Sequence, residues 1–332
     1  MNFAPLIKCL SPINFGVSGL KLTYFIYYSR LKGINEYDLV HAHFGNVGAF
    51  FAKFVSLGLF EGLPYMVSFH GYDLAPNQTE KNKKLYRQLF RSSKLFTVNS
   101  FYMRGILERI DKEINFRVKV LPMGVDISFF NKLNYPVKIV QNEVYSIIYV
   151  GRLVDLKGPD TAIEIVNRVV HDFGLNKIEL TIIGNGPLQD NLETKVLEKG
   201  LTGHVRLLGG QDQSIVSAIL SQGDLFVYTG RVQQVTNRAE TQGLVLIEAQ
   251  AMGLPVLAFD VGGVGESILN GETGILIPAG DVDEFARLLV ILLNDSERRL
   301  KMGISARKFI KDNFDSAVLG KKLLDIYDEV LG

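Results

Sequence analysis

A chain of 332 residues with 47% apolar content can bury substantial hydrophobic cores, and its length favours two domains over one. No stretch reaches the roughly 18 uninterrupted apolar residues of a membrane span, and the first thirty residues lack the charged, apolar and cleavage-site order of a secretory leader. The single cysteine, Cys9, excludes an internal disulfide, and no Cys/His cluster has the spacing of metal ligands. We therefore expect a cytoplasmic protein without a bound metal or cofactor.

The net charge of +1 conceals an uneven distribution along the chain. Residues up to 130 hold 16 Lys and Arg against 9 Asp and Glu, whereas the remainder holds 20 against 26. Two aromatic segments, 24–28 and 50–54, lie in the basic half. They indicate either core aromatics beneath a solvated basic face or peripheral contact with an anionic membrane surface. Nucleic acid is not an expected partner, because the basic residues are not clustered with a recognition motif.

Short apolar strands alternate with helical patterns along the first 130 residues. The predicted strands are 37–42, 64–69, 95–99 and 118–121, and the predicted helices are 47–59, 79–91 and 102–110. His70 ends the second of these strands, where a side chain can face a ligand cleft. His41 and His43 share one strand face, but no Asp or Cys partner is near them, so no metal site is predicted.

A stretch without a clear period, at 131–144, is the predicted linker to a second strand and helix series. The strands of that series are predicted at 146–150, 179–183, 205–207, 225–228, 255–259 and 274–277, and the last helices at 296–314 and 316–331. Such alternation predicts parallel sheets covered on both faces. We expect an α/β protein with two Rossmann-like domains, 1–130 and 145–315, and a C-terminal helix at 316–332.

Two cations follow the first strand of the second domain. Arg152 and Lys157 lie on the loop at its carboxyl end, where ligands of open α/β sheets bind, and they can neutralise a departing anion in place of a metal ion. The next strand ends in a Gly-x-Gly turn at Gly184, but Gln189 stands where a dinucleotide site has its third glycine. The turn brings backbone near the ligand, with Leu208 beside a nucleotide base, or it serves packing alone.

The most informative pattern is the pair Glu240 and Glu248, which brackets the start of a helix. That helix is expected to open at Gly243 and to end before the Gly-Leu-Pro segment at 253–255. Its first N–H groups, those of Gly243, Leu244 and Val245, suit an anion such as a diphosphate. Glu248 lies about 7 Å further along the axis, where it can accept hydrogen bonds from a pair of sugar hydroxyls.

Together with the glycine pair after the following strand, Gly262 and Gly263, this segment resembles the retaining glycosyltransferases of family 4, which carry a Glu-x₇-Glu motif in this setting. The match extends over about 145–295. It implies the GT-B fold, in which two Rossmann-like domains face a cleft. It also implies that Arg152 and Lys157 hold the donor diphosphate.

The resemblance further implies that Glu240 and the amides around Gly262 and Gly263 hold the transferred sugar, and that His70 contacts it near the reacting carbon. The only Asp-x-Asp, at 281–283, predicts a helix cap rather than a metal site. Transfer is then expected from a nucleoside diphosphate sugar, with UDP favoured over GDP, to a saccharide or lipid-linked saccharide. The relatives that it suggests assemble bacterial cell-surface polysaccharide.

Two alternatives remain open at this point. Members of the resembled family open with a strand and a Gly-rich loop, which this chain lacks at its first residues, so the first domain is expected to be short. A non-catalytic subunit that binds sugar nucleotides would bind donor without transfer. A sugar-nucleotide epimerase would convert the donor with no acceptor present.

Overall fold

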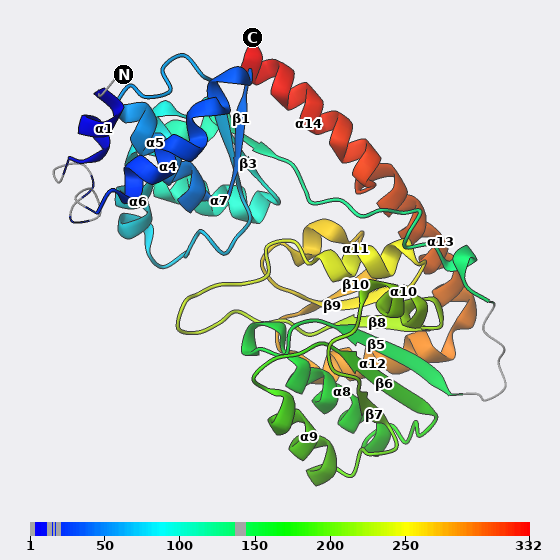
Figure 1. Cartoon of the computed structure of the whole chain (residues 1–332). Helices are drawn as coiled ribbons and strands as arrows, with labels where there is room; N and C mark the ends of the chain where they lie inside the picture. The colour runs from blue at the N-terminus through cyan, green and yellow to red at the C-terminus, as the bar shows by residue number, and fades with distance from the viewer. Residues whose placement is uncertain (1–3, 12–14, 16, 18–20, 137–143) are drawn as a thin grey trace. The chain divides into compact units, whose positions relative to one another are not determined.

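The computed structural model describes residues 4–11, 15, 17, 21–136 and 144–332, and the chain divides into two compact units (Figure 1). The first unit comprises Met1–Val98, Arg104–Leu121 and Leu323–Gly332, and the second comprises Asn99–Met103 and Pro122–Lys322. Seven positions of the expected linker, 137–143, lie outside the described residues.

The first unit is built on a parallel sheet with strand order β1-β2-β3-β4. Its strands are β1 (Val40–His43), β2 (Tyr65–Phe69), β3 (Leu95–Val98) and β4 (Val118–Val120), and its connecting helices are α5 (Gly45–Ser56), α6 (Thr79–Ser92) and α7 (Phe101–Ile110). Every residue of β2 and β3 is buried, as is typical of parallel strands covered on both faces. These strands and helices confirm the predicted series.

Within the described residues of this unit, the α-helices α1 (Ala4–Cys9) and α4 (Thr23–Leu31) were not predicted from the sequence. The ring of Tyr24 on α4 stacks on Phe15 with centroids 3.8 Å apart and lies 5.5 Å from Phe50 on α5. Phe54, which is fully buried, packs against both Tyr24 and Phe50. The two aromatic segments therefore pack together. None of the helices in the described part of the chain is long and apolar enough to cross a bilayer.

The last helix, α14 (Ser316–Leu331), completes the core of the first unit. Ile326 and Val330 pack against Met66 of β2 and Leu95 of β3. The Tyr327 hydroxyl lies 2.8 Å from Nδ1 of His41, whose Nε2 is 2.7 Å from the Ser68 hydroxyl. Burial, followed by the nearby His43 and His70, lowers the pKa of His41 to about 4, so this imidazole is a neutral structural group at pH 7.

The second unit contains a six-stranded parallel sheet in the order β10-β9-β8-β5-β6-β7. The strands are β5 (Tyr145–Val150), β6 (Ile178–Ile183), β7 (Val205–Leu207), β8 (Leu225–Tyr228), β9 (Val256–Asp260) and β10 (Gly274–Pro278). Helices α8 (Pro159–His171), α9 (Gln189–Glu198) and α12 (Val282–Asn294) cover one face, and α10 (Gln213–Ser221) and α11 (Leu244–Ala251) cover the other (Figure 1). This doubly wound arrangement confirms the predicted fold class.

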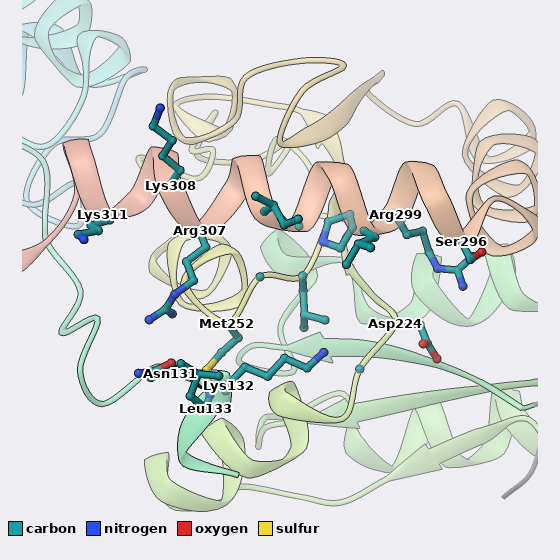
Figure 2. A pocket seen from close by; sticks show the side chains of 17 residues that line it. Asn131, Lys132, Leu133, Asp224, Met252, Ser296, Arg299, Arg307, Lys308 and Lys311 are labelled. Atoms are coloured by element: carbon teal, nitrogen blue, oxygen red, sulfur yellow. Dashed lines mark hydrogen bonds between the residues drawn. The ribbon is translucent and has the colours of Figure 1, made fainter. Parts of the chain in front are cut away.

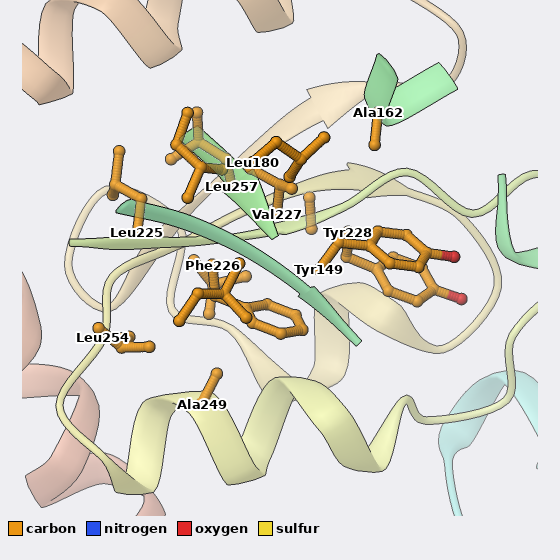
Figure 3. Close-up of a cluster of buried hydrophobic side chains, with 14 of the residues drawn as sticks. Tyr149, Ala162, Leu180, Leu225, Phe226, Val227, Tyr228, Ala249, Leu254 and Leu257 are labelled. Carbon is orange, nitrogen blue, oxygen red and sulfur yellow. The ribbon is translucent and has the colours of Figure 1, made fainter. Parts of the chain in front are cut away.

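The strand order of this sheet reverses between β5 and β8, which are adjacent in space although two strands separate them in sequence. Tyr149 of β5 and Tyr228 of β8 are buried there, and Figure 3 shows both hydroxyls pointing the same way. Phe226 and Leu257 fill the core behind them. Such a reversal opens a crevice at the carboxyl ends of the strands, so the two tyrosines mark the floor of a candidate site.

Candidate functional site

The candidate site begins with an ion pair at the carboxyl edge of the six-stranded sheet. Lys157 lies in the loop after β5, and Glu240 lies in the loop after β8. The Lys157 ammonium pairs with Oε2 of Glu240, and the Tyr228 hydroxyl donates a 2.8 Å hydrogen bond to the same oxygen. The fold therefore joins two predicted site residues that are 83 positions apart.

The Glu240 carboxylate is largely buried, with 13% of its side chain exposed, and Lys157 has 17% exposed. Burial alone would raise the pKa of Glu240, but the Lys157 ammonium and the hydrogen bonds from Tyr228 and Thr241 outweigh it and lower that pKa. Burial and the nearby carboxylate raise the pKa of Tyr228. At neutral pH the site therefore holds an ionised Glu240 and a neutral tyrosine that donates to it.

Gly158 locks the loop after β5 against the loop after β8. Its backbone has a φ of +62°, and a Cβ added there would lie 2.0 Å from the Thr229 carbonyl oxygen. The Thr229 hydroxyl in turn donates a 2.7 Å hydrogen bond to the Gly158 carbonyl. Because only glycine fits this approach, the position of Lys157 beside Glu240 depends on a backbone contact.

Gly184 and Gly186 pack the loop after β6 in the same way. A Cβ on Gly184 would lie 1.8 Å from the Gly151 carbonyl oxygen, and one on Gly186 would lie 2.3 Å from that of Leu153. These contacts give the Gly-x-Gly turn a packing role, which was one of the two interpretations left open. Leu208, half-buried after β7, is fixed by a 3.0 Å hydrogen bond from its N–H to the Ile182 carbonyl.

The N-terminus of α11 begins at Gly243, which has a φ of +80° and lies just before the first helical residue. The N–H groups of Gly243, Leu244 and Val245 belong to the first turn, where backbone donors have no acceptor inside the helix. Leu244 is exposed and Val245 is half-buried. The predicted anion-binding donors are therefore at the start of a helix, three residues beyond Glu240.

Gly262 and Gly263 contact the glutamate loop through their backbone. A Cβ on Gly262 would lie 2.1 Å from the Glu240 carbonyl oxygen, and one on Gly263 would lie 2.0 Å from that of Thr241. The Gly263 N–H donates a 2.8 Å hydrogen bond to the Glu240 carbonyl. In this structure that amide positions Glu240 and is already occupied.

Glu248 faces a separate cavity of about 310 Å³ beside the first turns of α10 and α11. Leu244, Ile247, Gln213 and Asp126 are among the residues that line it. Burial raises the pKa of the Glu248 carboxyl, and no hydrogen bond or ion pair links its side chain to the described residues. A half-buried carboxyl without a protein partner is available to a ligand that enters this cavity.

Arg152 and His70 complete the predicted set. Arg152 is exposed directly after β5, and its side chain has no hydrogen bond or ion pair within the described part of the chain.

His70 belongs to the first unit, where its Nε2 lies 3.0 Å from Nδ1 of His43. Burial, and then His43, lowers the pKa of His70. Asp73 fixes this strand end by accepting hydrogen bonds from the N–H groups of His70, Gly71 and Gly45.

Tyr228 and Asp73 were not predicted from the sequence. Tyr228 is the last residue of a strand that was correctly predicted, so the strand's end was a usable signal, but its contact with Glu240 depends on how the following loop folds back. Asp73 follows His70 by three residues, a spacing at which a short carboxylate commonly accepts local backbone hydrogen bonds.

Comparison with known proteins shows the family. The model described as "Glycosyl transferases group 1" matches residues 134–309, and the model described as "Glycosyltransferase Family 4" matches residues 9–129. The amylovoran biosynthesis glycosyltransferase AmsK of Erwinia amylovora is 27% identical over 294 residues, which cover 88% of this chain and 70% of the relative. A GDP-mannose-dependent phosphatidylinositol monomannoside mannosyltransferase of Mycobacterium tuberculosis is 25% identical over 265 residues, which cover 78% and 68%.

Among solved structures, HepE of Anabaena in complex with UDP superposes with a TM-score of 0.79 at 19% identity, over 91% of this chain and 81% of that one. That likeness concerns the fold, and it agrees with the two parallel-sheet units described above. The chain is a GT-B glycosyltransferase that belongs to the group 1 glycosyl transferases, with a family 4 N-terminal region.

Proposed function

We propose that this protein is a retaining, metal-independent glycosyltransferase that moves a sugar from a UDP-sugar to a saccharide or lipid-linked saccharide in cell-surface polysaccharide biosynthesis. The observation that carries the proposal is the cluster of Lys157, Glu240 and Tyr228 at the reversal of strand order. Glu240 lies three residues before Gly243, where α11 begins and its first N–H groups have no acceptor inside the helix. Together these groups supply cationic, anionic and hydrogen-bond-donating functions at one sheet edge.

In the proposed reaction the bond between the anomeric carbon and the diphosphate breaks, and a bond from the acceptor oxygen forms on the same face. The acceptor proton passes to the leaving phosphate oxygen, so no covalent enzyme intermediate is required. Arg152, Lys157 and the first N–H groups of α11 stabilise the negative charge on the leaving diphosphate. These groups supply the positive charge and hydrogen-bond donors that a divalent ion supplies in other transferases.

The remaining groups bind the donor. The Glu248 carboxyl accepts hydrogen bonds from the ribose, since it is half-buried beside its cavity and pairs with none of the described residues. Glu240 accepts hydrogen bonds from the transferred sugar, Leu208 borders the base, and His70 of the first unit contacts the reacting sugar. The Gly184 and Gly262 turns keep these loops in close backbone contact.

The choice of UDP draws support from HepE, whose structure contains UDP, and the polysaccharide context from the name of AmsK. The mycobacterial relative is named for GDP-mannose, so GDP-sugars form the contrasting arm of the test. We expect purified protein to be stabilised against heat by UDP-sugars more than by GDP-sugars. With acceptor and EDTA present, it should form a product whose anomeric configuration in NMR spectra matches the donor.

A stable complex with donor but no transfer would identify a non-catalytic subunit. Conversion of the donor without acceptor would identify an epimerase. An inverted product, or complete loss of activity in EDTA, would contradict the mechanism.

Glu248→Gln should weaken UDP binding by about tenfold, because the neutral amide replaces an acceptor carboxylate with a weaker hydrogen-bonding group. Isothermal titration with UDP measures this change. Glu272→Gln makes the same chemical change on an exposed turn. It is the matched control and should bind UDP as the wild type does. Unchanged affinity in Glu248→Gln would remove its ribose role.

Arg152→Ala should reduce kcat by about 100-fold with the fold preserved, since it removes one group that stabilises the leaving diphosphate. Lys157→Ala should reduce kcat at least as much, because it also leaves Glu240 buried without its cation. Arg206→Ala, an exposed arginine on β7, serves as control in the same steady-state assay. Near-normal turnover in both variants would show that other groups carry the diphosphate.

Tyr228→Phe should move the acidic limb of the kcat/KM profile to higher pH by about half to one unit. The Tyr228 hydrogen bond lowers the pKa of Glu240, and its loss, a net effect of about 1 kcal/mol, lets that pKa rise. Ionised Glu240 is then lost at a higher pH as the solution is acidified. Tyr145→Phe, at the first residue of β5 and therefore at the amino edge of the sheet, should leave the pH profile unchanged. Equal profiles for the two variants would exclude this coupling.

A further inference from the structure

A second hollow of about 640 Å³ lies in the second unit, away from the residues discussed so far (Figure 2). It is formed by helix α13 (Ser296–Asn313), the segment 131–133, and the turns 223–224 and 252–255. Those turns come directly before β8 and β9. The groove is therefore at the amino edge of the parallel sheet, opposite the carboxyl edge that holds Lys157 and Glu240. We call it the α13 groove.

The α13 groove carries an unusual amount of exposed apolar surface. Leu133, Leu300 and Ile304 all line it, and they are 89%, 66% and 64% exposed. Met252 and Leu254, both buried, continue the apolar lining. Single exposed apolar residues are ordinary, but several around one hollow indicate a surface that is covered by an apolar group.

Positive charge surrounds this apolar surface. Five cationic side chains line the groove, namely Lys132, Arg299, Arg307, Lys308 and Lys311, against the single acid Asp224. Figure 2 shows Arg307, Lys308 and Lys311 toward one end of α13, with the Lys308 ammonium pointing away from the segment that carries Lys132 and the Lys132 side chain extending toward Asp224. Asp224 accepts a 2.7 Å hydrogen bond from the Ser146 N–H, so its carboxylate is already engaged.

The five cations divide into two groups. Arg299 and Arg307 donate to backbone carbonyls, including those of Leu292 and Phe130, and so serve the packing of α13. The ammonium groups of Lys132, Lys308 and Lys311 make no hydrogen bond or ion pair with any residue that the structure describes. Three unpaired ammonium groups beside one apolar hollow can be satisfied by an anionic ligand.

We propose that the α13 groove binds an anionic amphiphile. Its aliphatic chain lies on Leu133, Leu300 and Ile304. Its phosphate headgroup is bound by Lys132, Lys308 and Lys311, whose exposed side chains turn toward it on binding. A free phosphate would leave the apolar side chains in water, and a neutral chain would leave the ammonium groups unpaired. The combination of both chemistries selects a ligand that carries both, and this site is independent of the donor site at the opposite sheet edge.

The test is calorimetric titration of the full chain with dodecyl phosphate below its micelle concentration, in excess UDP so that anion binding at α11 is suppressed. Two controls are titrated in parallel. Inorganic phosphate carries the charge without the aliphatic chain, and dodecyl maltoside carries the chain without the charge. We expect dodecyl phosphate to bind at least tenfold more tightly than either. Cosedimentation with phosphatidylglycerol vesicles, compared with phosphatidylcholine vesicles, then distinguishes a lipid held in a bilayer from a free amphiphile.

Two sets of variants locate the site. Replacing Lys132, Lys308 and Lys311 together by Glu should weaken dodecyl phosphate binding at least tenfold. The same three charge changes at Lys301, Lys321 and Lys322, which are exposed and do not line the groove, should leave it within twofold. Leu300→Ser combined with Ile304→Ser should weaken dodecyl phosphate but not inorganic phosphate. Thermal stabilisation by UDP should be the same in all of these variants.

Equal losses in the two lysine sets, or equal affinities for dodecyl phosphate and inorganic phosphate, would overturn the proposal by showing general attraction of anions. A dimer of the wild type that dissociates in the groove variant, with no dodecyl phosphate binding, would assign the groove to a second copy of the chain. If UDP does not stabilise the wild type against heat, the proposed donor site is contradicted. The dodecyl phosphate titrations still test the α13 groove in that case.

Discussion

The buried ion pair between Lys157 and Glu240 is the constraint around which the candidate site is organised. A carboxylate with so little exposure cannot remain ionised without a close cation and hydrogen-bond donors. Lys157 and Tyr228 satisfy both needs at one oxygen atom. Removal of one partner from such a pair costs about 3–5 kcal/mol in buried sites. The pair therefore links the chemistry of the site to the stability of the two loops that carry it.

Those two loops are held by backbone contacts that only glycine permits. Gly158 meets the loop after β8, Gly184 meets the loop after β5, and Gly262 and Gly263 meet the glutamate loop. Each contact is closer than any side chain would allow, so four loops at one sheet edge form a nearly continuous backbone layer. Such a layer can hold charged side chains at fixed positions before a ligand binds, which is what electrostatic stabilisation of a leaving group requires.

The second unit uses its two sheet edges differently. The carboxyl edge combines paired charge, the first N–H groups of α11 and a Glu248 carboxyl that pairs with no described residue, which are features that suit a polar, phosphorylated ligand. The amino edge combines exposed leucine and isoleucine with lysines on and near α13 that have no partner within the described part of the chain. Because parallel strands keep these edges apart, the chain can offer two chemically distinct surfaces on one sheet without one interfering with the other.

Local sequence patterns were enough to predict every strand that the described residues form, the doubly wound class and the helix that begins after Glu240, because apolar runs between glycines and prolines specify buried parallel strands at short range. They were also enough to nominate Arg152, Lys157, Glu240 and Glu248. They missed α4, whose aromatic residues have low helix propensity and are held by packing on α5. Only the tertiary structure decided four features: the contact between Tyr228 and Glu240, the occupied Gly263 amide, the packing of α14 in the first unit, and the α13 groove. Each joins segments that are distant in sequence, and no local periodicity records which loops meet once strands pair out of order.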